Sequence, residues 1–145
     1  MQKVVGSSPI IRSQEPRTSG AFSSLMAADL RPCILVADDS REFAALVCAT
    51  LEDAGFHVVT AYSGPAAIAA IRDNHVAAAV LDVLMPGIAG DAVADRIRHL
   101  KPGLPILLMT GAAGKQFVTS SELPVLLKPF RHEELVDSVR RLLDP

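Results

Sequence analysis

The sequence predicts an α/β fold with a doubly wound, five-stranded parallel sheet. Short apolar runs alternate along the chain with segments of helical periodicity, and this alternation is typical of right-handed crossovers between parallel strands. Most of the runs are continuously apolar, as expected for strands covered on both faces. The predicted strands are 33–37, 56–61, 77–81, 105–109 and 124–127, and the predicted helices are 40–54, 63–72, 90–100 and 131–143.

Capping residues indicate where the first two helices begin and end. Ser40 is a suitable N-cap after the first strand, and Gly55 is a suitable C-terminal stop. Ser63 opens the next helix, with Pro65 in the first turn, where a missing N–H is tolerated. Apolar residues at helical spacing predict one buried face for the first, third and last helices: Val47 and Leu51, Val93 and Ile97, and Leu135 and Val139.

Length and composition limit the classes of function. The chain has 145 residues, enough for one domain, and 50% of them are hydrophobic. A net charge of -2, 4% aromatic residues and the lack of Trp give no basis for nucleic-acid binding. No apolar stretch approaches the roughly 18 residues of a membrane span, and the N-terminus lacks the pattern of a secretory signal. We therefore expect a cytoplasmic protein that binds neither nucleic acid nor membrane.

The N-terminal segment differs from the rest of the chain. Residues 1–31 are rich in turn and coil residues, and such a segment cannot bury enough surface to offset its ordering entropy. We predict a disordered extension over 1–31 and a folded domain over 32–145. Two interpretations of the extension stay open: a regulatory tail, or a start assigned too far upstream, with Met26 as the true start.

Polar residues suited to phosphoryl chemistry follow four of the apolar runs. Because ligands of doubly wound sheets bind at the carboxyl ends of the strands, these side chains are expected to converge at one edge. That edge would hold three carboxylates, one hydroxyl and one ammonium. The residues are Asp38 and Asp39 after the first strand, Asp82 after the third, Thr110 after the fourth and Lys128 after the fifth.

Three carboxylates at one edge favour a hard divalent cation. Two carboxylates about 4 Å apart repel by roughly 4 kcal/mol at an effective dielectric constant near 20, so a proton or a cation must relieve the charge. Oxygen ligands without nearby His or Cys favour Mg²⁺ or Mn²⁺. The Thr110 hydroxyl and the Lys128 ammonium would share the negative charge of a transferring phosphoryl group. Asp82, on the middle strand, is then the natural nucleophile and forms an aspartyl phosphate.

The segments around these positions closely resemble the receiver domain of two-component response regulators. They are 35–40 (LVADDS), 81–87 (LDVLMPG), 109–111 (MTG) and 127–130 (LKPF), and the resemblance covers about residues 32–143. Each motif is weak alone, but together and in this order they are highly specific. The resemblance implies the flavodoxin-like strand order 2-1-3-4-5. It also implies Mg²⁺-dependent receipt of a phosphoryl group from a histidine kinase or a histidine phosphotransfer protein.

The resemblance also implies a role for each site residue. Lys128 and Pro129 are expected to be joined by a cis bond, which would aim the lysine inward. A domain of this kind is not an enzyme in its own right, since it assists only its own phosphorylation and dephosphorylation. By likeness, Asp82 is the phosphoryl acceptor; Asp38, Asp39, Asp82 and the backbone carbonyl of Leu84 are the metal ligands; and Thr110 and Lys128 bind the phosphoryl oxygens.

The chain departs from the family pattern in its switch region. Many receivers have a Tyr or Phe three residues before the lysine, but here that position is Val125. Ala112, which follows Gly111, begins a short segment, 112–123, that is a poor helix former. We hypothesise that this segment orders or shifts on phosphorylation in place of the aromatic side chain. Leu84 and Ala112 replace polar residues that position the hydrolytic water in similar proteins, which predicts slow self-dephosphorylation.

The last helix ends close to the end of the sequence, which favours a single-domain regulator that acts by protein contact on an unknown downstream target. Three other interpretations stay open. A pseudo-receiver would signal by binding alone, although the intact Asp82, Thr110 and Lys128 argue against it. An aspartyl-phosphate-forming phosphohydrolase would show Asp-x-Asp at the first strand end and would need a cap. A flavin-binding electron carrier would need a hydroxyl- or glycine-rich loop where the acidic pair stands.

Overall fold

The fold is the predicted one. The computed structural model describes residues 30–88, 90–114 and 122–144, so residues 1–29 of the predicted extension and residues 115–121 of the predicted switch segment lie outside the described residues. Five parallel strands form one sheet in the order β2-β1-β3-β4-β5. The elements in chain order are β1 (Cys33–Ala37), α2 (Arg41–Asp53), β2 (His57–Ala61), α3 (Gly64–Asp73), β3 (Ala78–Asp82), α4 (Gly90–Leu100), β4 (Ile106–Thr110), β5 (Val125–Leu127) and α5 (His132–Leu143).

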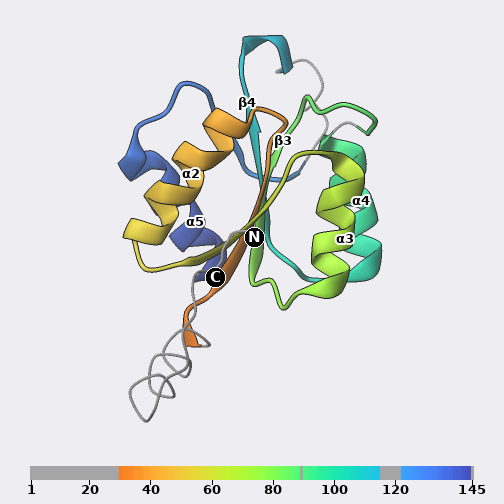
Figure 1. Ribbon diagram of the computed structural model, residues 1–145, viewed down its shortest axis with the longest axis horizontal. Coiled ribbons are helices and arrows are strands. Elements are labelled where there is room, and N and C mark those ends of the chain that lie inside the picture. Colours follow the sequence, from red (N-terminus) through yellow and green to blue (C-terminus); the bar gives the residue numbers. More distant parts are fainter. Residues whose placement is uncertain (1–29, 89, 115–121, 145) are drawn as a thin grey trace, which may run out of the picture.

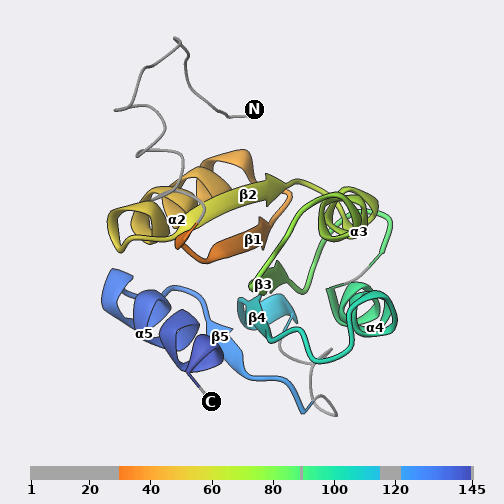
Figure 2. The same ribbon diagram turned by 90° about the horizontal axis from the view of Figure 1, so that it is seen from below.

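Helices cover both faces of the sheet. Helices α2 and α5 lie on one face, and α3 and α4 lie on the other (Figures 1 and 2). Successive side chains of β1 point to opposite faces: Ile34 and Val36 enter the cluster under α2 and α5, and Leu35 and Ala37 enter the cluster under α3 and α4. All four are fully buried, which explains why the strand is continuously apolar. None of the helices in the described part of the chain is long and apolar enough to cross a membrane.

The predicted caps are confirmed. The Ser40 Oγ accepts a hydrogen bond of 3.2 Å from the Phe43 N–H, and the Ser63 Oγ accepts one of 3.2 Å from the Ala66 N–H. Gly55, with a φ of 99°, lies in the left-handed region that ends helices. The first of these caps fixes the start of α2 directly after the acidic pair, at the edge of the sheet where the site forms.

The prediction that the last strand is buried on both faces is wrong. Strand β5 has only three residues, and Val125 and Leu127 are 36% and 47% exposed. The strand lies at the edge of the sheet, and only Leu126 packs into the cluster under α2 and α5. The side chains of Val125 and Leu127 point to the opposite face, and neither belongs to the cluster under α3 and α4.

Candidate functional site

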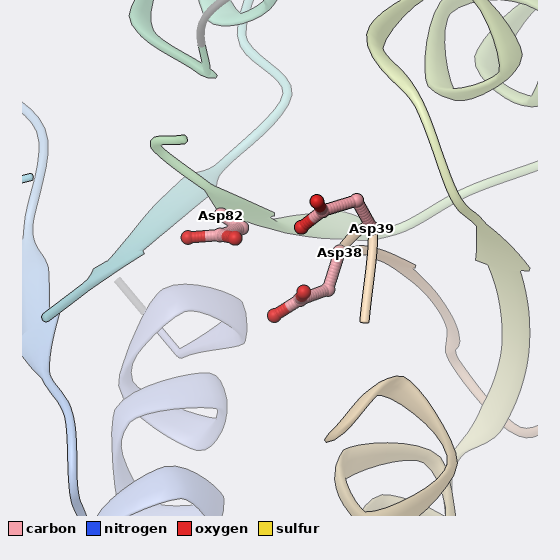
Figure 3. A group of neighbouring side chains, drawn as sticks. All are labelled: Asp38, Asp39 and Asp82. Atoms are coloured by element: carbon pink, nitrogen blue, oxygen red, sulfur yellow. The ribbon is translucent and has the colours of Figure 1, made fainter. Parts of the chain in front are cut away.

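The three acidic residues converge as predicted. Strands β1 and β3 are neighbours with Ala37 opposite Leu81, so the residues that follow, Asp38 and Asp82, lie side by side. Asp38, Asp39 and Asp82 each offer a carboxylate oxygen, and these atoms all lie within 4.8 Å of one another (Figure 3). Asp38 and Asp82 are buried, whereas Asp39 is exposed.

The turn that brings Asp38 and Asp39 to the same side begins at the helix cap. The Ser40 N–H donates a hydrogen bond of 2.9 Å to Asp38 Oδ1, which closes the turn between β1 and α2. The Asp38 N–H donates a bond of 3.0 Å to the Ala61 carbonyl and so continues the pairing with β2. Hydrogen bonds therefore hold both the backbone N–H and the Oδ1 atom of Asp38, and its second carboxylate oxygen, Oδ2, faces the site.

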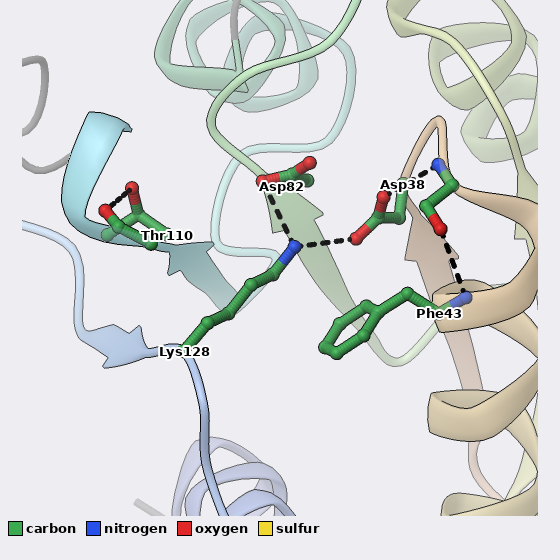
Figure 4. Close-up of polar contacts among 7 residues, drawn as sticks. Asp38, Phe43, Asp82, Thr110 and Lys128 are labelled. Atoms are coloured by element: carbon green, nitrogen blue, oxygen red, sulfur yellow. Dashed lines mark hydrogen bonds and ion pairs between the residues drawn. The ribbon is translucent and has the colours of Figure 1, made fainter.

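Lys128 brings a positive charge to the acidic cluster from the far edge of the sheet. Its Nζ lies 3.0 Å from Asp38 Oδ2 and 3.6 Å from Asp82 Oδ1 (Figure 4). The Lys128 N–H donates a bond of 2.8 Å to the Thr110 carbonyl, which fixes the backbone where β5 ends. The expected cis bond between Lys128 and Pro129 is present. The predicted convergence of the carboxylates and the ammonium is thus confirmed.

The environment of Asp82 opposes its ionisation. Burial and the neighbouring Asp38 carboxylate raise the pKa of Asp82 from 3.8 to about 6, although the Lys128 ammonium and a hydrogen bond from the Leu84 backbone act in the opposite direction. Three ionised carboxylates and one ammonium would leave a formal charge of -2. This uncompensated charge on hard oxygen donors fits Mg²⁺ or Mn²⁺, for which Asp38, Asp39 and Asp82 are the candidate ligands.

Thr110 lies at the same edge, but its hydroxyl is turned into its own loop. The hydroxyl donates a hydrogen bond of 3.1 Å to the Gly111 carbonyl, and among the described residues it makes none to Asp82 or Lys128 (Figure 4). Gly114 packs directly on the hydroxyl oxygen, so closely that a Cβ at this glycine would collide with it. Contact between Thr110 and a phosphoryl group on Asp82 would therefore require the hydroxyl to turn.

The remaining predicted positions surround the cluster. Leu84 lies two residues after Asp82, and its side chain is 42% exposed. Gly111 is half-buried and Ala112 is exposed in the turn after β4. Val125 is paired with Leu108 of β4, two residues before Thr110, so it lies farther than Thr110 from the carboxyl ends of the strands. The roles assigned to these residues stay predictions.

Comparisons with known proteins agree with the fold and identify the family. A family model described as "Response regulator receiver domain" matches residues 34–140. The chain belongs to the response regulator receiver family. Receiver domains generally bind Mg²⁺ at an acidic pocket and are phosphorylated by histidine kinases.

Among relatives of this receiver domain is a protein of Mycobacterium tuberculosis described as a probable transcriptional regulatory protein, TcrX. The alignment is 129 residues long with 36% identity, and it covers 80% of this chain and 52% of TcrX, so the chain spans about half of that relative. The alignment with the receiver protein CpdR of Brucella abortus is 114 residues long with 30% identity, and it covers 76% of this chain and 95% of CpdR. The crystal structure of a response regulator receiver protein from Sinorhizobium medicae matches with a TM-score of 0.73 and 29% identity, covering 79% of this chain and 96% of that one.

Sequence reasoning missed one feature of the receiver site, an aromatic pair beside Lys128. The Lys128 Nζ lies 4.1 Å from the centroid of the Phe43 ring. Phe130 meets the same ring edge-on, with centroids 5.7 Å apart and an interplanar angle of 75°. The helical pattern assigns Phe43 to core packing. Its position three residues after the Ser40 cap was the available signal, because the first turn of α2 adjoins the acidic pair.

Proposed function

We propose that Asp82 accepts a phosphoryl group from a histidine kinase or a histidine phosphotransfer protein, with Mg²⁺ held by Asp38, Asp39 and Asp82. One observation carries the proposal: the three carboxylates gather within 4.8 Å, and the Lys128 ammonium lies 3.6 Å from Asp82. The site occurs in a chain of the receiver family. Membership alone would also fit a pseudo-receiver, but a pseudo-receiver has no need of this arrangement.

The chemistry assigns a separate task to each group. A carboxylate oxygen of Asp82 attacks the phosphorus of the donor phosphohistidine, the P–O bond forms, and the P–N bond breaks as the imidazole departs. Lys128 lies close enough to Asp82 to stabilise the new phosphoryl oxygens, and the Thr110 hydroxyl joins them after turning away from Gly111. Bound Mg²⁺ supplies positive charge that lets the anionic donor approach the carboxylates.

The experiment uses phosphoramidate as a small phosphoryl donor, with Mg²⁺, and intact-mass spectrometry as the readout. The wild-type protein should gain the mass of one phosphoryl group, and Asp82→Asn should gain none. Asp137→Asn is the matched control, because Asp137 is an exposed acid on α5 outside the cluster. Labelling that persists in Asp82→Asn would refute the assigned acceptor, and an unlabelled wild-type protein would favour the pseudo-receiver.

The proposal includes slow loss of the phosphoryl group and no turnover of other substrates. The Leu84 side chain is 42% exposed next to Asp82 and offers no hydrogen bond to a hydrolytic water. We expect Leu84→Asn to shorten the lifetime of the phosphorylated protein several-fold, measured as phosphate release after removal of the donor. A lifetime unchanged by Leu84→Asn would show that this position does not control hydrolysis.

The proposed output is contact with another protein, as expected for a single-domain regulator. Its support is the match to CpdR, which spans 95% of that protein. Val125 in place of an aromatic residue does not prevent such contact, since the mode of coupling to a partner can differ from that of other receivers.

A further inference from the structure

Three groups among the described residues lie close to the Lys128 ammonium. Its Nζ lies 3.0 Å from Asp38 Oδ2 and 3.6 Å from Asp82 Oδ1. The third neighbour is the Phe43 ring, whose centroid lies 4.1 Å from Nζ, with the ring directed toward the lysine (Figure 4). The side chain of Lys128 is only 24% exposed, so it is largely shielded from solvent.

The ring and the carboxylates act on the ammonium in different ways. A carboxylate oxygen accepts a directed hydrogen bond, whereas the face of an aromatic ring attracts a cation over its whole area through its quadrupole. The ring can therefore hold the charge while the ammonium changes its hydrogen-bond partner. The ring also excludes water from one side of Nζ, which strengthens the attraction of Nζ to the carboxylates.

The proposed chemistry requires such a change of partner. In the described structure Lys128 lies closer to Asp38 than to Asp82, and Asp38 is also a candidate ligand of Mg²⁺. When a phosphoryl group is attached to Asp82, the ammonium binds its oxygens by turning N–H donors from Asp38 Oδ2 toward them. A lysine that moved into solvent on the way would populate many rotamers and would lose its alignment.

We propose that Phe43 is a positioning residue for phosphoryl transfer, because its ring face keeps the Lys128 ammonium beside Asp82 while the ammonium exchanges Asp38 for the phosphoryl oxygens. The inference rests on the proposed function, in which Asp82 is the acceptor. Phe43 touches no phosphoryl oxygen and acts only through Lys128.

Phe43 is itself fixed in place, as a positioning role demands. Its N–H donates a hydrogen bond of 3.2 Å to the Ser40 Oγ in the first turn of α2. Its ring packs edge-to-face with Phe130 at 5.7 Å and lies against the core cluster under α2 and α5. Phe130 follows Pro129 directly after the lysine, so the two aromatic side chains hold the segment that carries Lys128 against α2.

The test is a double-mutant cycle between Phe43→Leu and Lys128→Gln, with phosphoramidate as the donor and saturating Mg²⁺. Phe43→Leu keeps an apolar side chain in the cluster but removes the ring face. We expect it to slow phosphorylation of Asp82 about three- to tenfold when Lys128 is present. In the Lys128→Gln background it should change the rate by less than about twofold. Equal slowing in both backgrounds would overturn the proposal, because the effect would then not pass through Lys128.

Two further variants separate positioning from packing. Phe43→Tyr retains the ring face and should keep the rate within about twofold of wild type. Phe130→Leu removes the edge contact but leaves the Phe43 face under the ammonium, and its effect should be smaller than that of Phe43→Leu. If Phe43→Tyr or Phe130→Leu slowed phosphorylation of Asp82 as much as Phe43→Leu does, the proposal would be overturned.

Folding and acceptor identity are measured in the same series. Urea unfolding shows whether each variant is folded, and Phe43→Met takes the place of Phe43→Leu if the leucine variant is not. Failure of the proposed function would appear as a wild-type protein that is not labelled on Asp82. Failure of the Phe43 proposal would appear as labelled variants whose changes in activation free energy are additive in the cycle.

Discussion

Asp82→Asn is expected to stabilise the protein in the absence of divalent cations. The native structure raises the pKa of Asp82 from 3.8 to about 6, so the native state binds more protons than the unfolded state between these values. The free energy of unfolding of the wild type therefore falls as the pH rises through this window and levels off above it. Asn has a similar shape and no charge, so the variant avoids this loss.

The magnitude follows from the two pKa values. The pKa of Asp82 rises from 3.8 to about 6 on folding, and each unit of pKa corresponds to about 1.4 kcal/mol. Ionised Asp82 therefore destabilises the native state by at most about 3 kcal/mol. We expect Asp82→Asn to be about 2 kcal/mol more stable than wild type at pH 7.5, and the two proteins to be equally stable near pH 4. Urea unfolding followed by circular dichroism measures this, since the chain has no Trp.

Mg²⁺ should reduce the difference in unfolding free energy between Asp82→Asn and the wild type. A ligand that binds only the native state stabilises it by mass action, and the wild-type site offers one more carboxylate than the variant does. Asp137→Asn, which changes an exposed acid on α5, should alter stability by less than about 0.5 kcal/mol. An Asp82→Asn variant no more stable than wild type at pH 7.5 without Mg²⁺ would refute the reasoning that burial and Asp38 oppose the charge.

Three further outcomes are expected. Gly114→Ala should destabilise the protein by about 1–3 kcal/mol, because its Cβ would collide with the Thr110 hydroxyl. Gly111→Ala is the control, since a Cβ at Gly111 would meet no atom within 4 Å. Equal unfolding free energies for the two variants would contradict the close packing of Gly114 on Thr110. Ser40→Ala should lower stability by about 1 kcal/mol through loss of the helix cap, and a thermal melt identical to wild type would argue against the cap. Lys128→Gln should bind Mg²⁺ several-fold more tightly by calorimetry, because it removes a positive charge 3.0 Å from a candidate ligand; weaker binding would show that Lys128 instead organises the carboxylates.

The position of most site residues could be predicted from the sequence because backbone topology determines it. Asp38, Asp82 and Lys128 each follow an apolar strand, and the carboxyl ends of parallel strands share one edge of the sheet. Once the alternation of strands and helices was recognised, no side-chain detail was needed to bring these three residues together.

The orientation of particular side chains could not be predicted in this way. The Thr110 hydroxyl turns to Gly111 because Gly114 leaves room beside it, and the Phe43 ring faces Lys128 because Phe130 supports it from the edge. Both arrangements depend on residues that a periodic pattern treats as interchangeable. The prediction that β5 is buried on both faces was wrong for a related reason: an apolar run indicates a strand, but it does not distinguish an edge strand from a central one.

The contact between Gly114 and Thr110 links two equilibria. If the Thr110 hydroxyl binds the phosphoryl group, its hydrogen bond to the Gly111 carbonyl is lost whenever Asp82 is phosphorylated, and the turn at 111–114 is then free to rearrange. Thermodynamic reciprocity then applies: any partner that favours the rearranged turn stabilises the phosphorylated state by the same coupling free energy with which phosphorylation favours binding of that partner. A glycine that merely fits against a hydroxyl would in this way give the receiver a route for communication that does not need an aromatic residue at position 125.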